Sequence, residues 1–170
     1  MSGRGKADWT LKRKRRHRRW WVKWLANRDT RGLYARMLRS IEDGEQGPVK
    51  RYLHGMTPVI FLALLQRITP RIQKMDTQMR KAIPAGLRLC FTLKYLFGGQ
   101  SYSSLSFCFR VSLSAVVKII PEVSAALVQY HVDTYRRAPR TLQLPNPSGN
   151  LEQWLDSIVA RILCWQVQLG

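Results

Sequence analysis

The sequence predicts an all-α protein: a small helical bundle with a helix-turn-helix-like unit, preceded by a basic N-terminal arm. Apolar residues recur at intervals of three and four along most of the chain, which is the spacing of one face of an α-helix. Helix start and stop residues frame these patterns, as at Thr57-Pro58 and Gly98-Gly99. With 170 residues, 45% of them apolar, the chain has room for one domain with its own core.

The arm, residues 1–19, holds the densest charge in the chain. Within residues 1–31, twelve Lys and Arg residues stand against two acidic ones, so this stretch carries +10 of the total formal charge of +19. An unpaired guanidinium is too costly to bury, so the run needs a polyanion, an acidic protein surface or bulk water. Nucleic acid is the expected partner, and the same run suits a nuclear import signal. A solvated arm that only improves solubility is the alternative. The cationic run comprises Lys12, Arg13, Lys14, Arg15, Arg16, His17, Arg18 and Arg19.

Two helices and a loop are expected next. Apolar spacing predicts the first helix from Arg18 onward, with Trp21 and Trp24 on one face, and a second over residues 33–41. The glycine-rich and acidic stretch 42–48 is expected to form a polar loop.

A third helix has its own start signal. Thr57 is the expected N-cap and Pro58 the first helical residue, and the helix should end near Pro70. Asp76 is expected to cap a further helix beginning at Thr77.

The most informative part of the body is a trio of helices with short connections. Pro84 opens the first, and Gly98-Gly99 end it. A tight turn over Ser112 to Ser114 separates the second from the third, which passes Pro121. This order is the layout of a helix-turn-helix module, although any small bundle can show it. The three helices are expected over residues 84–97, 101–110 and 116–132.

The end of the chain is expected to be a separate helix. Residues 20–138 are predicted to form the helix-turn-helix-like domain, residues 139–150 a linker, and residues 151–170 a last amphipathic helix. Nothing is expected to cover its Trp154 and Trp165.

No catalytic or metal site is expected. Cys90, Cys108 and Cys164 are odd in number and widely spaced, so each is expected to be a small buried residue in a reducing compartment. The three histidines are scattered, without zinc spacing. Glu152 and Asp156 lie one helical turn apart; a solvated acidic face is a better interpretation than a metal pair. No cofactor is expected. The longest apolar run, residues 59–65, is too short to span a bilayer, so the chain is expected to be soluble and not membrane-bound.

A series of short phrases runs along the chain: Trp20-Trp21, Trp24-Leu25, Phe61–Leu65, Pro70–Ile72, Asp76-Thr77, Met79-Arg80, Ala82-Ile83, Leu93–Leu96, Gly98–Tyr102, Phe109–Ser112, Val116–Ile120 and Glu122-Val123. Through these phrases, residues 20–165 resemble the N-terminal half of the PIF/Harbinger transposases and of the nuclease-like host genes derived from them. The resemblance implies a helical region with a helix-turn-helix-like unit in front of an RNase H-like domain, in which three carboxylates hold two divalent metals. The first carboxylate of that family follows a Trp matching Trp165, in a Gly-x-x-Asp-Gly phrase that this chain does not reach.

These observations together predict a non-catalytic, transposase-derived DNA-binding or interaction protein of the nucleus, with a Myb-like DNA-binding protein as the partner that the resemblance implies. One alternative is a truncated fragment or isoform of a Harbinger-type nuclease without activity of its own. Another is binding of the basic, Trp-rich segment to a membrane surface. The expected DNA contacts are Lys12, Arg13, Lys14, Arg15, Arg16, Arg18 and Arg19 in the arm, and Arg110, Ser112, Ser114 and Lys118 at the turn.

Overall fold

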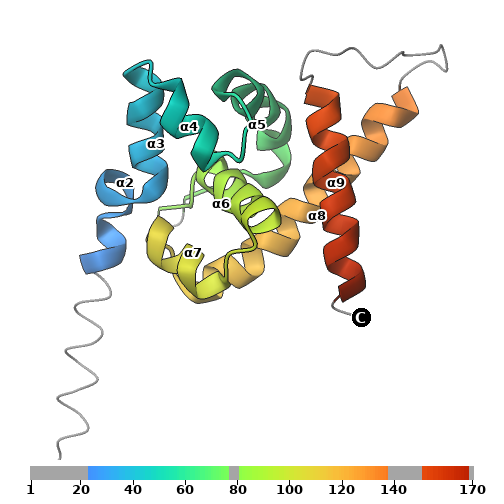
Figure 1. The fold of residues 1–170 in the computed structure, drawn as a ribbon. Helices are drawn as coiled ribbons and strands as arrows, with labels where there is room; N and C mark the ends of the chain where they lie inside the picture. The colour runs from blue at the N-terminus through green and yellow to red at the C-terminus, as the bar shows by residue number, and fades with distance from the viewer. Residues whose placement is uncertain (1–22, 77–80, 138–150, 169–170) are drawn as a thin grey trace, which may run out of the picture.

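The computed structural model describes residues 23–76, 81–137 and 151–168, and this part of the chain consists of α-helices and their connections, without a strand (Figure 1). The prediction of a small all-α bundle is therefore confirmed. Residues 23–26 are helical and lead into the labelled elements. These are α2 (Arg28–Arg31), α3 (Leu33–Glu42), α4 (Gln46–Tyr52), α5 (Pro58–Ile72), α6 (Ala85–Gly98), α7 (Tyr102–Phe109), α8 (Leu113–Arg137) and α9 (Leu151–Gln168).

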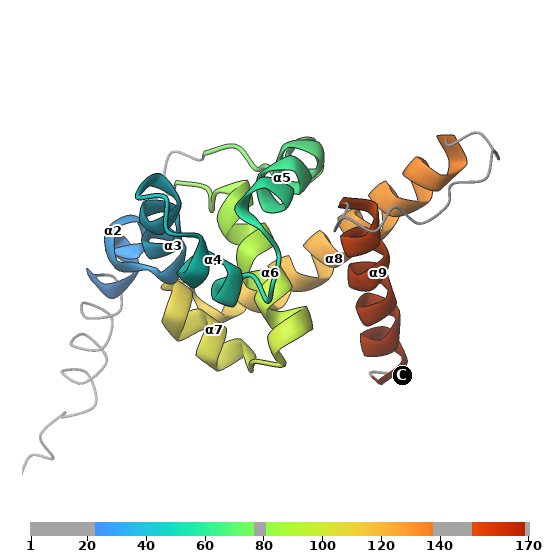
Figure 2. The same ribbon diagram turned by 45° about the horizontal axis from the view of Figure 1, so that its top comes forward.

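The central helix of the bundle is α6. Its first nine residues, 85–93, are all buried, because α5, α7, α8 and α9 pack around it (Figure 2). A helix that is buried on every side belongs to the core rather than to the surface. Gly86 is needed for this packing, since a Cβ at that position would lie 2.0 Å from the Tyr34 hydroxyl oxygen. The helix ends where predicted, with Gly99 in the left-handed conformation at φ 59°.

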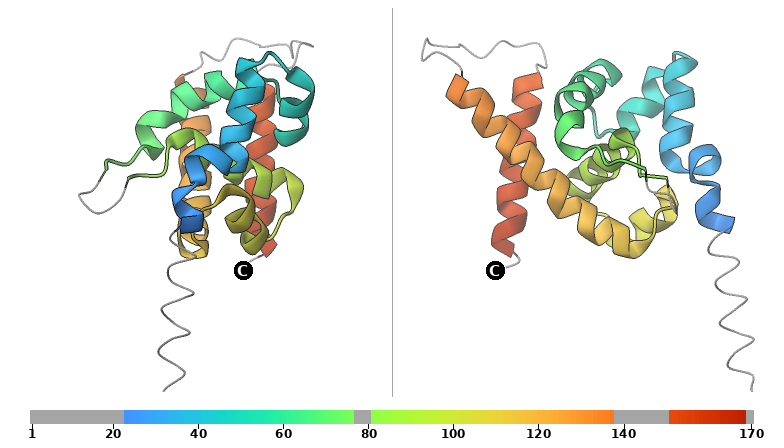
Figure 3. Two further views of the ribbon diagram at one scale, coloured as in Figure 1. Left: turned by 90° about the vertical axis from the view of Figure 1, so that its left-hand side faces the viewer. Right: turned by 180° about the vertical axis from the view of Figure 1, so that it is seen from behind.

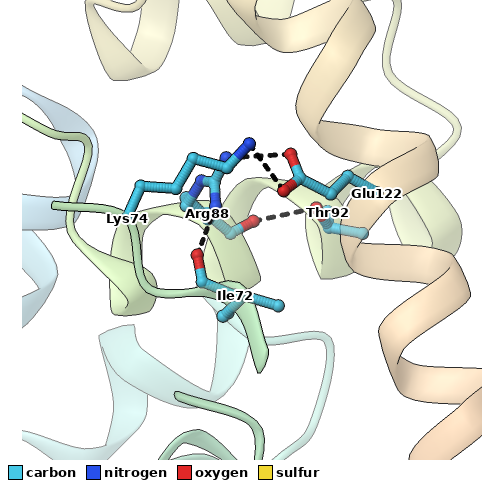
Figure 4. Close-up of polar contacts among 5 residues, drawn as sticks. All are labelled: Ile72, Lys74, Arg88, Thr92 and Glu122. Carbon is cyan, nitrogen blue, oxygen red and sulfur yellow. Dashed lines mark hydrogen bonds and ion pairs between the residues drawn. The ribbon is translucent and has the colours of Figure 1, made fainter. Parts of the chain in front are cut away.

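One charged side chain, Arg88, is buried in this core, with 4% of its surface exposed. Its Nη2 lies 3.0 Å from Oε2 of Glu122 on α8, and its Nη1 donates to the carbonyl of Ile72, the last residue of α5 (Figure 4). The last carbonyls of a helix lack partners within the helix and carry its negative end charge, so a guanidinium suits that position. Lys74 completes the cluster with its Nζ 2.8 Å from Oε1 of Glu122. Arg88 thus joins three helices.

Several helix boundaries differ from the sequence prediction; α8, for instance, runs over Leu113–Arg137 rather than 116–132. The polar loop expected over residues 42–48 is shorter, because α4 already begins at Gln46 and includes Pro48 in its first turn. Proline is tolerated there, since the first N–H groups of a helix have no partner in any case. Helix α5 also continues past Pro70 to Ile72. The missing N–H of Pro70 removes one hydrogen bond near the end of the helix, where few remain to be lost.

The two predicted N-cap residues, Thr57 and Asp76, have different hydrogen-bond partners from one another. The Thr57 hydroxyl accepts a hydrogen bond from the Ile60 N–H at 3.4 Å, as predicted for an N-cap. Asp76 accepts instead from the N–H of Ala82 at 2.7 Å. The helix expected to begin at Thr77 falls on residues 77–80, which lie outside the described residues, and residues 81–84 are not helical.

Helix α9 is part of the same core, so the expectation that Trp154 and Trp165 lack cover was wrong. Figures 1 and 3 show α9 crossing α8. The ring of Trp154 contacts Phe97 of α6 edge to face at 5.7 Å between centroids, and Trp165 contacts Tyr95 in the same way at 5.7 Å. Helices α6 and α8 therefore cover the apolar side of α9. The buried residues of α9 are Leu155, Ile158, Val159 and Ile162.

Helix α8 combines length with apolar composition, and its segment Leu113–Thr134 is long and apolar enough to cross a membrane by those two criteria alone. About a third of this segment is buried in the bundle, which accounts for part of that composition. Glu122 of the same segment binds Arg88, and five of its apolar residues are at most 4% exposed: Val116, Ile119, Ile120, Val123 and Leu127.

The buried cluster generates the first prediction. Replacement of Arg88 by Met should lower the free energy of unfolding by about 3 kcal/mol, because the Ile72 carbonyl loses its partner and the Glu122 carboxylate keeps only the more exposed Lys74. The same substitution at Arg36, exposed on α3, is the matched control and should cost less than about 0.5 kcal/mol. Urea unfolding followed by circular dichroism measures both. Equal losses in the two variants would show that Arg88 does not connect the helices energetically.

The packing of α9 generates the second prediction. Ile158→Ala should cost about 3 kcal/mol of unfolding free energy, since Ile158 is 0% exposed and its removal leaves a cavity. Leu163→Ala on the same helix should cost less than about 1 kcal/mol, because Leu163 is 51% exposed. Denaturant unfolding of both variants checks this, and a fully tolerated Ile158→Ala would contradict the docking of α9 on the bundle.

Candidate nucleic-acid interface

The turn between α7 and α8 is built from three residues, 110–112. Buried Ser106 holds it: the Ser106 hydroxyl donates to the Val111 carbonyl at 2.6 Å, and the Ser106 carbonyl accepts from the Val111 N–H at 3.2 Å. The Ser112 carbonyl then accepts the first hydrogen bonds of α8, from the N–H groups of Ala115 and Val116. The turn is therefore fixed at both ends. It starts and ends slightly earlier than the predicted turn over residues 112–114.

Arg110 occupies the strained position of this turn. It has a φ of 53°, in the left-handed region that favours glycine. Its Nη1 donates to the Trp24 carbonyl at 3.3 Å, and its guanidinium lies 5.5 Å from the centre of the Trp24 ring. A hydrogen bond and a cation–π contact thus tie the turn to the helical segment that directly follows the arm. Arg110 was predicted as a DNA contact; in the structure it positions the turn.

The other predicted residues of the turn lie at the start of α8. Ser114 and Lys118 are exposed and one helical turn apart, so they share a face of α8. Ser112 is half-buried, and its hydroxyl oxygen lies 3.4 Å from that of Ser114. The structure therefore brings these three residues together. The seven predicted arm residues, from Lys12 to Arg19, lie outside the described residues.

The sequence reasoning missed an aromatic contact beside the turn. Phe107 on α7 is 67% exposed, and its ring centre lies 5.6 Å from that of Trp24. A signal was present, because Phe107 falls off the apolar face that Leu105 and Phe109 define on a helix. An exposed Phe on an otherwise patterned helix is a departure that points to the surface rather than to the core.

Many cationic side chains in the described part of the chain, those beside the turn among them, are not paired with a carboxylate. Three acidic side chains on α8 and α9 are engaged: Glu122 with Lys74 and Arg88, Asp133 with Arg71 at 2.6 Å, and Asp156 with His131 at 2.7 Å. Among the described residues, no carboxylate lies within 4.0 Å of Lys23, Arg31 or Lys118. The first two belong to the segment beside α7 and the third to the start of α8. The cations near the turn are thus left to attract an external anion.

Potential metal ligands and the cysteines are the other groups that could carry chemistry. Within the described ranges, no three His, Cys, Asp or Glu side chains gather closely enough to hold a metal ion. Burial raises the pKa of the Cys90 thiol to about 12, which suits the predicted packing role. The prediction of burial was wrong for Cys164, which is exposed on the outer side of α9, and Cys108 is half-buried.

His54 lies in the connection between α4 and α5, next to the end of α6. His54 has a φ of 54°, and its ring stacks on Phe97 at 6.2 Å between centroids. Burial lowers the pKa of His54, and the nearby charges of Lys94 and Arg161 lower it further. The imidazole is therefore neutral at pH 7. Its close contact with Gly98, where a Cβ would lie 3.0 Å from the ring, gives it a packing role.

No protein-family model, curated protein or solved structure matches the chain.

The strained turn generates the third prediction. Arg110→Ala should lower the unfolding free energy by about 2 kcal/mol through loss of the two Trp24 contacts, while the strain of a left-handed non-glycine residue stays as in the wild type. Arg110→Gly removes the same side chain but adopts that conformation freely, so it should cost roughly 1 kcal/mol less. Urea unfolding of the two variants measures the difference. A Gly variant no more stable than the Ala variant would contradict the role of backbone strain at this turn.

Proposed function

We propose that this chain is a non-catalytic, DNA-binding protein of the nucleus, in which the basic arm follows the phosphates and the start of α8 lies against the duplex. The observation that carries the proposal is the run Lys12–Arg19, joined by a short segment to a folded bundle in which no carboxylate of the described residues pairs with Lys23. Such a charge excess favours a polyanion.

The α7–α8 unit supports the second half of the proposal. Its turn is three residues long, and Ser114 and Lys118 project from the first turns of the longer helix, where a recognition helix would meet DNA. A serine hydroxyl and a lysine suit phosphate contacts. The exposed side chains here offer few donors and acceptors for base edges, so the binding is expected to depend weakly on sequence.

The resemblance to the PIF/Harbinger N-terminal region agrees with this role. In that family, targeting of DNA is often shared with a Myb-like protein, so such a protein is the proposed partner. The same basic run is proposed to direct nuclear import.

The salt dependence of DNA binding tests the proposal. If the arm neutralises about six phosphates, log K should fall with log salt at a slope near about −5, and deletion of residues 1–19 should flatten that slope. Lys118→Ala should reduce the slope by about one unit, as for loss of one phosphate contact. Fluorescence anisotropy with a labelled duplex across a salt series measures all three proteins.

The matched control is Arg136→Ala. Arg136 is exposed on the same helix, 18 residues further along, which at 1.5 Å per residue is about 27 Å from Lys118. This variant should keep the wild-type slope. A salt-independent affinity, or an arm deletion without effect, would show that the charge serves another partner.

A further inference from the structure

Phe107 has no role in the core of the bundle. It is 67% exposed on α7, whereas the neighbouring Leu105 and Phe109 are 0% exposed. Among the side chains whose exposure the structure describes, it is the only aromatic one in the exposed class. Leaving a phenyl ring in water forgoes most of its hydrophobic stabilisation, so this position is better explained by a contact outside the chain.

The ring of Phe107 is held rather than loose. It lies against Trp24 with 5.6 Å between centroids and 31° between ring planes, and Trp24 itself is only 9% exposed. Arg110 contacts the same indole ring at 5.5 Å. Phe107 is therefore an aromatic ring supported on a fixed base, with most of its surface still available.

The surroundings of the ring are polar and cationic. The exposed residues of α7 on the same face are Ser103 and Ser104, four and three positions before Phe107. Lys23 is exposed directly before Trp24. Trp24 lies five positions after Arg19, and an extended chain covers at most about 3.6 Å per position. The cationic run therefore ends within about 18 Å of Trp24.

These features select one kind of occupant. A protein partner that docked through Phe107 would require a broader apolar patch, and the exposed neighbours on α7 are serines. Nucleic-acid bases combine a flat apolar face with a phosphate backbone, which matches an exposed ring beside cations and hydroxyl groups. Bases in a duplex are already stacked on both faces, so only an unpaired base gains a new stacking contact without the cost of unstacking.

We propose that Phe107 is a stacking platform for an unpaired base, so that the protein prefers nucleic acid with single-stranded segments over a fully paired duplex. This inference rests on the proposed function and adds the class of nucleic acid to it. The phosphates on either side of the stacked base would face Lys23.

The test compares Phe107→Leu with Phe107→Tyr in the full chain. Leucine keeps an apolar side chain and removes the ring, whereas tyrosine keeps the ring. The probes are a single-stranded oligothymidine and a blunt-ended, fully paired duplex with the same number of phosphates, at one salt concentration, read by fluorescence anisotropy. Phe107→Leu should weaken binding of the single strand about tenfold, as for loss of one base–aromatic stack, and leave duplex binding unchanged. Phe107→Tyr should bind both probes as the wild type does.

The other outcomes overturn either the stacking alone or both proposals. Equal losses on both probes, or wild-type affinity of Phe107→Leu for both, would overturn base stacking while the arm-dependent binding of DNA stands. A wild-type protein that binds neither probe overturns the proposed function and the stacking together. Thermal unfolding of the variants provides the folding control, since an exposed ring should change the midpoint little.

Discussion

The bundle depends on one buried guanidinium. Arg88 lies on the central helix, and from there it binds the terminal carbonyl of α5 and the carboxylate of Glu122 on α8. Without it, the end of α5 would leave a carbonyl unsatisfied in the core, and α6 and α8 would touch through apolar groups alone. Apolar packing is tolerant of small rotations and slips, whereas a hydrogen-bonded pair is not, so the Arg88 cluster fixes how α5, α6 and α8 are oriented. The turn that follows α7 inherits its position from this arrangement, since α8 begins at that turn.

The helices were predictable where local signals were strong. Thr57 with Pro58, Gly98 with Gly99, and Ser101 each stand at an observed helix end, because capping depends on residues within a few positions of each other. The burial of Arg88 was not predictable in this way. Its partners lie 16 and 34 residues away in the chain, and no spacing rule links an arginine to a distant carbonyl. The contacts that cover Trp154 and Trp165 were not predictable for the same reason. Their partners, Phe97 and Tyr95, belong to a helix that is distant in the sequence.

The candidate interface was predicted in part. The spacing of residues 112, 114 and 118 predicted that these side chains lie together. In the structure, residue 112 directly precedes α8, and residues 114 and 118 lie in its first two turns. Arg110 has a different use from the predicted one, since a long cationic side chain at a helix end can turn inward as easily as outward. Sequence alone does not reveal which direction it takes when an indole ring from residue 24 is within reach. Phe107 was not predicted, because apolar spacing identifies the buried face of α7 and not a residue that departs from it.

Internal pairing also shapes what the surface can attract. Three of the acidic groups on α8 and α9, Glu122, Asp133 and Asp156, are held by Arg71, Lys74, Arg88 and His131, so these carboxylates do little to neutralise charge elsewhere. Acids are scarce in this chain, and beside α7 and in the N-terminal segment no carboxylate of the described residues pairs with Lys23, Arg31 or Lys118. The same region carries the exposed ring of Phe107. Charge draws any polyanion regardless of its bases, whereas a ring distinguishes stacked bases from unstacked ones. Affinity and selectivity would therefore arise from different residues of one surface, the arm supplying the first and α7 the second.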